Sequence, residues 1–102
     1  MNMKIGIPSS KINEDMLIGT DEGEAVAIGA GYYLATGKIA KVYMDGNGFS
    51  NALDAITSLL IPYKIPVDIY VSARTDEPWH AVMGNNVERI AEIIGYERVK
   101  IY

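Results

Sequence analysis

Hydrophobic positions along the chain fall into short apolar runs separated by longer segments with helical spacing. The short runs predict strands at residues 3–7, 16–19, 39–44, 65–71 and 98–101. Helical spacing predicts helices over residues 21–37, over 50–61 and over 84–94. Because strands alternate with helices, the sequence predicts an α/β fold with a mostly parallel sheet and right-handed crossovers.

The helix expected at residues 21–37 carries clear signals at both ends. Asp21 is the expected N-cap, and Glu24 three residues later completes a capping box. Gly37 suits the left-handed position that commonly ends a helix. Gly29 and Gly31 lie inside this helix, where each costs roughly 1 kcal/mol relative to Ala. We therefore expect another helix or a ligand to approach the backbone closely there.

The remaining boundaries are set by polar residues, glycine and proline. Ser50 or Asn51 is expected to cap the second helix, which Pro62 ends. Residues 72–83 are expected to form a loop centred on residues 76–80. In the strand before that loop, Asp68 and Tyr70 alternate with apolar residues, so we expect one face of the strand to be incompletely buried.

One connection is shorter than the parallel sheet requires. Residues 8–15, which include Asn13, read as a loop and supply only eight positions between Ile7 and Met16. A connection between adjacent parallel strands needs about a dozen residues or more. Either the first two strands are not adjacent and parallel, or a crossover helix has been lost between them.

Composition and charge favour one globular domain over residues 1–102, because 49% of the residues are hydrophobic and 22% are charged. The net charge of -4, with scattered basic residues, argues against nucleic-acid binding. Since the chain has no cysteine, disulfides and cysteine-based metal sites are excluded, and we expect a cytoplasmic protein. No signal peptide or membrane-spanning run is visible.

Candidate chemistry is concentrated at one edge of the predicted sheet. In open α/β sheets, ligands bind beyond the carboxyl ends of the strands. Ser9, Glu22, residues 46–48 and residues 74–80 would all lie at that edge. We therefore expect a ligand site there.

Four segments, in the same order along the chain, resemble the pyrimidine-binding domain of thiamine diphosphate enzymes, and above all phosphonopyruvate and sulfopyruvate decarboxylases. They are Gly6-Ile7-Pro8-Ser9-Ser10, the segment from Glu22 to Lys38, the segment from Val42 to Leu59 with Gly48 and Asn51, and Asp76-Glu77-Pro78-Trp79-His80 with Gly84. The helix that the family has after its first strand is missing, and Trp79 stands where the family has Gln. The resemblance implies a three-layer open, mostly parallel sheet, shortened near the N-terminus.

The resemblance also implies roles for five residues. Glu22 matches the glutamate that hydrogen-bonds the aminopyrimidine ring of the cofactor and activates it, which makes it both catalytic and cofactor-binding. Gly48 and Asn51 would lie near the pyrimidine. Arg74 and His80 would bind a small 2-oxo acid substrate, and His80 would also be catalytic.

Local physics offers a simpler explanation for each residue. A carboxylate such as Glu22 in a first helical turn gains about 0.3–1 kcal/mol from the helix dipole. His80 could be a solvated or hydrogen-bonded loop histidine, and Arg74 an exposed arginine. Gly48 and Asn51 could be a turn glycine and a helix cap. The sequence leaves these alternatives open.

Two functional hypotheses follow. In the first, the chain is the pyrimidine-binding subunit of a two-component thiamine diphosphate-dependent decarboxylase of 2-oxo acids, within a homo- or hetero-oligomer. A separate diphosphate-binding subunit would then hold Mg²⁺, because this chain lacks the family's metal-binding motif. In the second, the chain is a non-catalytic, self-associating binding or scaffolding module derived from that domain.

Overall fold

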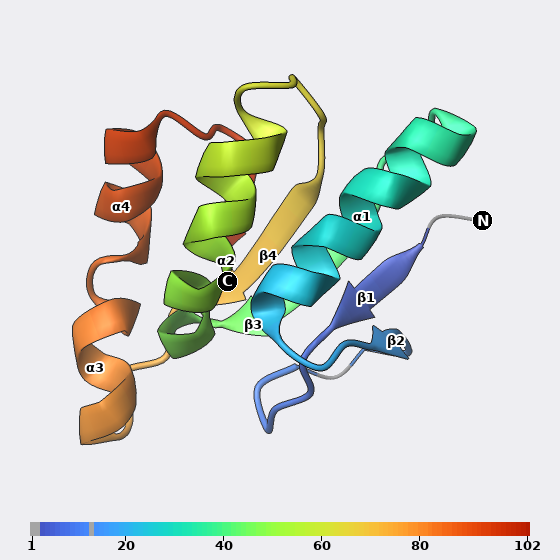
Figure 1. Ribbon diagram of the computed structural model, residues 1–102. Coiled ribbons are helices and arrows are strands. Elements are labelled where there is room, and N and C mark those ends of the chain that lie inside the picture. The colour runs from blue at the N-terminus through green and yellow to red at the C-terminus, as the bar shows by residue number, and fades with distance from the viewer. Residues whose placement is uncertain (1–2, 13) are drawn as a thin grey trace.

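The computed structural model describes residues 3–12 and 14–102. Its five strands form one open sheet flanked by helices (Figure 1). The elements in chain order are β1 (Lys4–Gly6), β2 (Leu17–Ile18), α1 (Glu22–Thr36), β3 (Lys41–Asp45), α2 (Phe49–Ala55), β4 (Asp68–Ser72), α3 (Pro78–Gly84), α4 (Val87–Ile94) and β5 (Val99–Ile101). The strand order is β2-β1-β3-β4-β5, and all neighbouring strands are parallel. The predicted α/β fold with a parallel sheet is confirmed.

The short first connection joins two adjacent parallel strands. Ile5 of β1 pairs with Leu17, and Gly6 pairs with Ile18. The loop between them is folded back by a bridge between Ser9 and Ile12, and Asn13 lies outside the described residues. Of the two alternatives that the sequence left open, the lost crossover helix is therefore confirmed.

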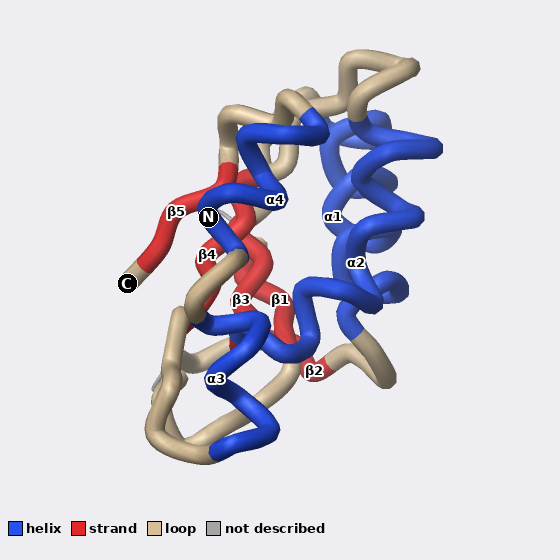
Figure 2. Tube along the Cα trace, turned by 90° about the vertical axis from the view of Figure 1, so that its left-hand side faces the viewer, coloured by secondary structure: helices blue, strands red, loops and turns tan. Residues whose placement is uncertain are grey.

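The helices α1, α2 and α4 lie together on one face of the sheet, as the two views at right angles show (Figures 1 and 2). Val42 and Met44 of β3, with Ile69 and Val71 of β4, point into the core on that face. The step from β1 to β2 runs in the opposite direction across the sheet from the steps β3 to β4 to β5. A right-handed crossover there would place its helix on the other face. The predicted shortening near the N-terminus therefore removes the third layer among the described residues.

Several local predictions are confirmed and two are wrong. In α1, the Asp21 carboxylate accepts the Glu24 N–H at 2.8 Å, and Gly37 ends the helix at φ 75°. The predicted caps Ser50 and Asn51 instead lie inside α2, because a 3-10 turn (Gly46–Gly48) extends the helical path towards the N-terminus. Half of the predicted loop at residues 72–83 is also helical, since Pro78 starts α3.

The two glycines of α1 have different surroundings. A Cβ at Gly29 would lie 3.2 Å from side-chain carbons of Val42 and Val67, so this glycine lets α1 approach its own sheet. Nothing lies within 4 Å of a Cβ built at Gly31, which faces outwards. No helix among the described residues has the length and apolar character needed to cross a membrane.

Candidate functional site

Two groups of polar side chains occupy the carboxyl edge of the sheet. The first, the Glu22 cluster, consists of Glu22, Gly48 and Asn51. The second, the Arg74 cluster, consists of Ser9, Ser10, Lys11, Asp45, Arg74 and Asp76. The turns and helices that follow β2, β3 and β4 carry most of these residues, as expected for an open α/β sheet.

The Glu22 cluster forms where the N-terminal ends of α1 and α2 meet. The side-chain amide of Asn51 donates a hydrogen bond to Glu22 Oε1 at 3.1 Å. The carboxylate lies directly over Gly48, where a Cβ would collide with Oε2 and Cδ of Glu22. The structure therefore brings together the three residues that the resemblance assigned to the cofactor, and it uses Gly48 to make room for the acid.

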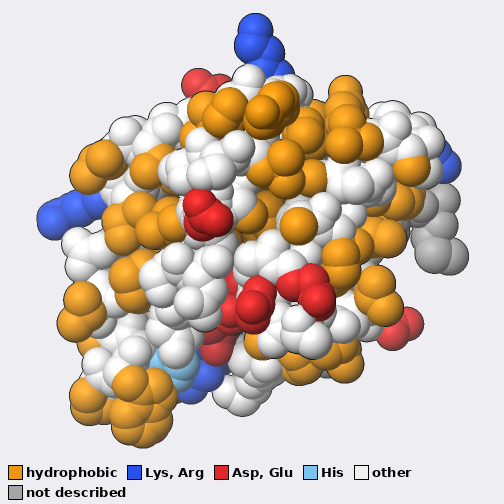
Figure 3. Space-filling view, viewed as in Figure 1, with side chains coloured by type: hydrophobic (Ala, Val, Ile, Leu, Met, Phe, Trp, Pro, Cys, Tyr) orange, Lys and Arg blue, Asp and Glu red, His pale blue; other side chains and the backbone are white. Residues whose placement is uncertain are grey.

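The two oxygens of Glu22 are in different situations. Oε1 is held by Asn51, whereas no hydrogen bond to Oε2 occurs within residues 3–12 and 14–102. Glu22 is half-buried, and acidic side chains gather on the surface near the start of α1 (Figure 3). A carboxylate with one anchored oxygen and one open oxygen is oriented to hold or move a proton at the open one.

His80 lies on α3, which packs against the turn that carries Gly48. The fit is close, because a Cβ at Gly46 would lie 3.3 Å from the Cα of Gly84. His80 is only 8% exposed, and its Nδ1 is buried with no hydrogen-bond partner in the described part of the chain. Leaving a buried polar atom unsatisfied costs about 1–3 kcal/mol. His80 is therefore not a solvated loop residue, and its environment calls for an explanation beyond packing.

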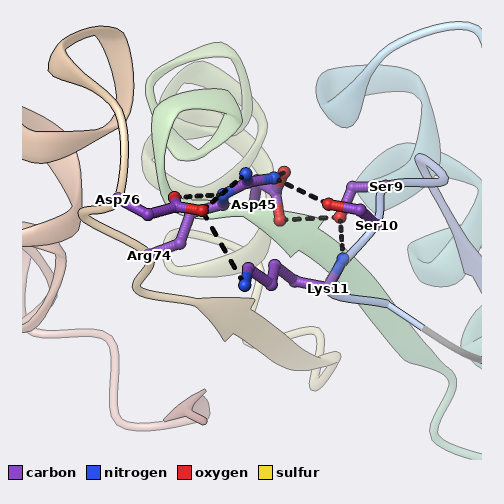
Figure 4. A network of polar contacts seen from close by, with 6 residues as sticks. All are labelled: Ser9, Ser10, Lys11, Asp45, Arg74 and Asp76. Atoms are coloured by element: carbon purple, nitrogen blue, oxygen red, sulfur yellow. Dashed lines mark hydrogen bonds and ion pairs between the residues drawn. The ribbon is translucent and has the colours of Figure 1, made fainter.

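The Arg74 cluster is a closed network (Figure 4). Arg74 donates through Nε and Nη2 to the two carboxylate oxygens of Asp76, at 2.9 and 3.1 Å. Its Nη1 reaches Ser10 Oγ at 3.3 Å and Asp45 Oδ2 at 3.5 Å. The other oxygen of Asp45 accepts a hydrogen bond from Ser9 Oγ at 2.9 Å. These contacts fasten the loop after β1 to the ends of β3 and β4.

The charges of Arg74 and Asp76 stabilise each other. Hydrogen bonding and attraction from Arg74 lower the pKa of Asp76 from 3.8 to about 2, and Asp76 in turn raises the pKa of Arg74. Four of the five N–H donors of a guanidinium are occupied. Arg74 is thus committed to neighbouring side chains, and a substrate anion would have to displace one of them.

A shallow hollow adjoins the Arg74 cluster. It has a volume of about 340 Å³, and its lining includes Lys11, Ser72, Arg74 and Tyr102. Residues 3–12 and 14–102 contain no group of three or more His, Cys, Asp or Glu side chains placed to hold a metal ion. The Arg74 cluster was not anticipated as a unit, because only the strand order places Ser9 beside Asp45.

Comparisons of the sequence with known proteins find similarity to two kinds of decarboxylase. The chain is 36% identical over 78 residues to sulfopyruvate decarboxylase subunit alpha of Methanocaldococcus jannaschii. This match covers 72% of the present chain and 46% of the relative. It is 37% identical over 70 residues to phosphonopyruvate decarboxylase of Streptomyces viridochromogenes, a match that covers 64% of this chain and 17% of the relative. A third match, to sulfopyruvate decarboxylase subunit alpha of Methanococcus maripaludis, is 40% identical over 57 residues and covers 56% of this chain and 34% of the relative.

Each of these matches spans less than half the length of the relative. No family model matches the chain. The resemblance inferred from the motifs is thus confirmed as similarity to part of the sulfopyruvate and phosphonopyruvate decarboxylases.

Proposed function

We propose that this chain is the pyrimidine-binding subunit of a two-component thiamine diphosphate-dependent decarboxylase that acts on sulfopyruvate, phosphonopyruvate or a similar small 2-oxo acid. The observation that carries the proposal is the convergence of Glu22, Gly48 and Asn51. Asn51 is 29 positions from Glu22 in sequence and still orients its carboxylate. A structural acid in a first helical turn needs no such partner.

The residues present fit the pyrimidine end of the cofactor. When bound, thiamine diphosphate supplies the electron sink for the loss of carbon dioxide. Glu22 Oε2 would accept or share a proton with the pyrimidine ring, while Asn51 holds Oε1 in place. Gly48 would keep the space beside the carboxylate free of side chains. The diphosphate and its Mg²⁺ would be held by a separate subunit.

His80 and Arg74 are the proposed substrate residues. The unsatisfied Nδ1 of His80 is a buried group that can exchange a hydrogen bond with a bound 2-oxo acid. A guanidinium suits phosphonate and sulfonate oxygens. Arg74 would serve in this role by exchanging Asp45 or Ser10, its two longer contacts, for the substrate.

Exposed apolar side chains on α1, β2 and α3 support a partner subunit. Leu34 on α1 is 69% exposed, and Leu17 and Ile18 of the neighbouring edge strand are 55% and 64% exposed. Gly31 lies on the outer side of α1 with open space above it. On α3, Trp79 and Val82 are 67% and 72% exposed. Hydrophobic side chains are visible over much of the helical face (Figure 3).

The test is reconstitution with a diphosphate-binding subunit, thiamine diphosphate and Mg²⁺. We expect the aldehyde product to form from sulfopyruvate or phosphonopyruvate only when both chains are present. Glu22→Gln should abolish product formation, because an amide cannot share the proton. Glu24→Gln is the matched control, since Glu24 lies in the same helical turn and only caps the helix. Equal turnover by the Glu22 variant would refute the catalytic role.

A non-catalytic module is the second candidate. It is favoured by the missing third layer and by the internal commitments of Arg74. Calorimetric titration separates the two proposals. If the chain self-associates and binds no thiamine diphosphate, even when mixed with a diphosphate-binding subunit, the non-catalytic module is the correct proposal.

A further inference from the structure

The face of the sheet opposite the helices carries an aromatic and charged surface, here called the open face: Lys41, Tyr43, Asp68, Tyr70, Lys100 and Tyr102. Tyr43 stacks on Tyr70 with ring centroids 4.9 Å apart and an interplanar angle of 15°. Tyr102 meets Tyr43 edge-on at 6.5 Å. Residues 7–12 and 14–16 cover the β1 side, where Glu14 reaches Tyr43. Tyr43 is therefore buried, while Tyr70 remains half-exposed and Tyr102 is 53% exposed.

Two lysines on the open face form no ion pair within the described residues, although the charges of Glu14 and Lys41 attract each other. The ammonium groups of Lys41 and Lys100 lie 5.9 and 5.6 Å from the ring centroid of Tyr70. The nearby Asp68 is already paired with Arg98 at 2.8 Å. The β5 side of the open face, with Lys100, therefore carries positive charge that no carboxylate of the described residues pairs.

The opposite side of the face carries two carboxylates and one lysine. Glu14, at the end of the covering loop, pairs with Lys4 at 2.9 Å, and this pairing lowers the pKa of Glu14. The neighbouring Asp15 is exposed and forms no ion pair among the described residues. Because Lys4 compensates Glu14, Asp15 leaves one net negative charge beside β1, whereas Lys100 leaves positive charge at β5.

We propose that the open face is the interface of a homodimer, in which a second copy of this chain packs sheet against sheet. A two-fold axis parallel to the strands would bring Lys100 of each copy towards Asp15 of the other. The same axis would bring the Tyr43–Tyr70 stacks of the two copies together near the centre. A parallel sheet is normally covered on both faces, and a closed two-fold contact supplies the second layer without forming filaments.

A second copy fits the face better than a nucleic acid does. Phosphates would meet the carboxylates of Glu14 and Asp15 on one side of the face, and the chain as a whole has a net charge of -4. The open face lies away from the Glu22 cluster, but Tyr102 also lines the hollow beside the Arg74 cluster, so the dimer would border the proposed substrate residue Arg74. Because the face is small, we expect a weak dimer with a dissociation constant on the order of micromolar.

The first test is sedimentation of the full chain over a wide range of concentrations. We expect a shift from 11.2 kDa towards twice that mass as concentration rises. Tyr70→Ala should weaken dimerisation by about tenfold or more, because it removes the aromatic centre. A chain that stays monomeric throughout, or a dimer unaffected by Tyr70→Ala, would overturn the proposal.

Charge reversal tests the orientation of the two copies. Lys100→Glu and Asp15→Lys should each weaken the dimer by about tenfold, because symmetry repeats each contact. The double variant should restore it. Arg89→Glu is the matched control, since Arg89 is exposed on α4 on the other side of the sheet. Failure of the double variant to recover would refute this arrangement.

Lysine acetylation gives an independent readout that no folding defect can imitate. Lys41 and Lys100 should be protected at high protein concentration, while Lys38 and Lys64, which are exposed elsewhere, should react equally at all concentrations. The same lysines can be probed with a single-stranded RNA oligonucleotide. RNA binding by a monomer, lost in Lys100→Glu, would replace the homodimer with a nucleic-acid surface.

Discussion

The Glu22 cluster and the Arg74 cluster occupy the same edge of the sheet and are built in opposite ways. Arg74 uses four N–H donors on three neighbouring side chains, so little hydrogen-bonding capacity is left. Glu22 has one oxygen anchored by Asn51 and one without a partner in the described residues. A saturated polar group stabilises the fold, whereas an oriented group with unused capacity is prepared for a ligand.

The space around Gly48 gives the largest expected effect. Gly48→Ala places a Cβ against the Glu22 carboxylate and should displace it. We expect decarboxylation by the reconstituted enzyme to fall by about 100-fold and the free energy of unfolding by about 1–3 kcal/mol. Gly31→Ala is the control, because its Cβ meets open space and should stabilise α1 by roughly 1 kcal/mol. Product assays and urea unfolding measure both. Full activity in Gly48→Ala would show that the position of Glu22 is unimportant.

His80 should behave like the Glu22 cluster. Removing its ring nitrogens by His80→Phe eliminates a buried atom that has no partner in the described residues. We expect stability to be unchanged or to rise by about 1 kcal/mol. Decarboxylation should nevertheless fall, by less than about 100-fold, since the exchangeable hydrogen bond is lost.

The comparison for His80 depends on separating stability from activity. Thermal unfolding and product formation should be measured on the same preparation of His80→Phe. A variant that loses stability in proportion to activity would place His80 with the structural residues instead.

Sequence alone predicted what depends on near neighbours. The capping of α1 by Asp21 and Glu24 involves residues three apart, so its signal is local. The contact between Asn51 and Glu22 cannot be read from the sequence, because it spans 29 positions and only the packing of α2 beside α1 creates it. The helix α3 was missed because seven residues starting at Pro78 are too short to show a hydrophobic period. Predicting which layer is missing would have required the strand order, because the strand order sets the direction of the first crossover.

Arg74→Met tests the structural side of the comparison. The variant keeps the length of the side chain but leaves Asp45 without its cation and Asp76 with only the 3.8 Å contact from Lys11. We expect the melting temperature to fall by several degrees and the loop after β1 to exchange its amide hydrogens faster. Arg74→Lys should recover only part of this loss, since an ammonium cannot form the paired contact with Asp76. An unchanged melting temperature with a raised KM would show that Arg74 serves substrate binding and not the fold.

The smallest expected effect is the acid dependence of the Arg74 cluster. The pKa of Asp76 is lowered from 3.8 to about 2, mainly by hydrogen bonds from Arg74. A depressed folded-state pKa adds stability that is fully present above pH 3.8 and is lost as pH falls towards 2. Asp76→Asn should therefore have a flatter curve of melting temperature against pH across this window, and a lower melting temperature above it. Because Asp76 is largely exposed, the difference should be small and should shrink in high salt, as expected for a screened surface pair. Parallel curves for the two proteins would mean that the pairing of Arg74 with Asp76 adds nothing to stability, and Arg74 would then be as available for a ligand as Glu22.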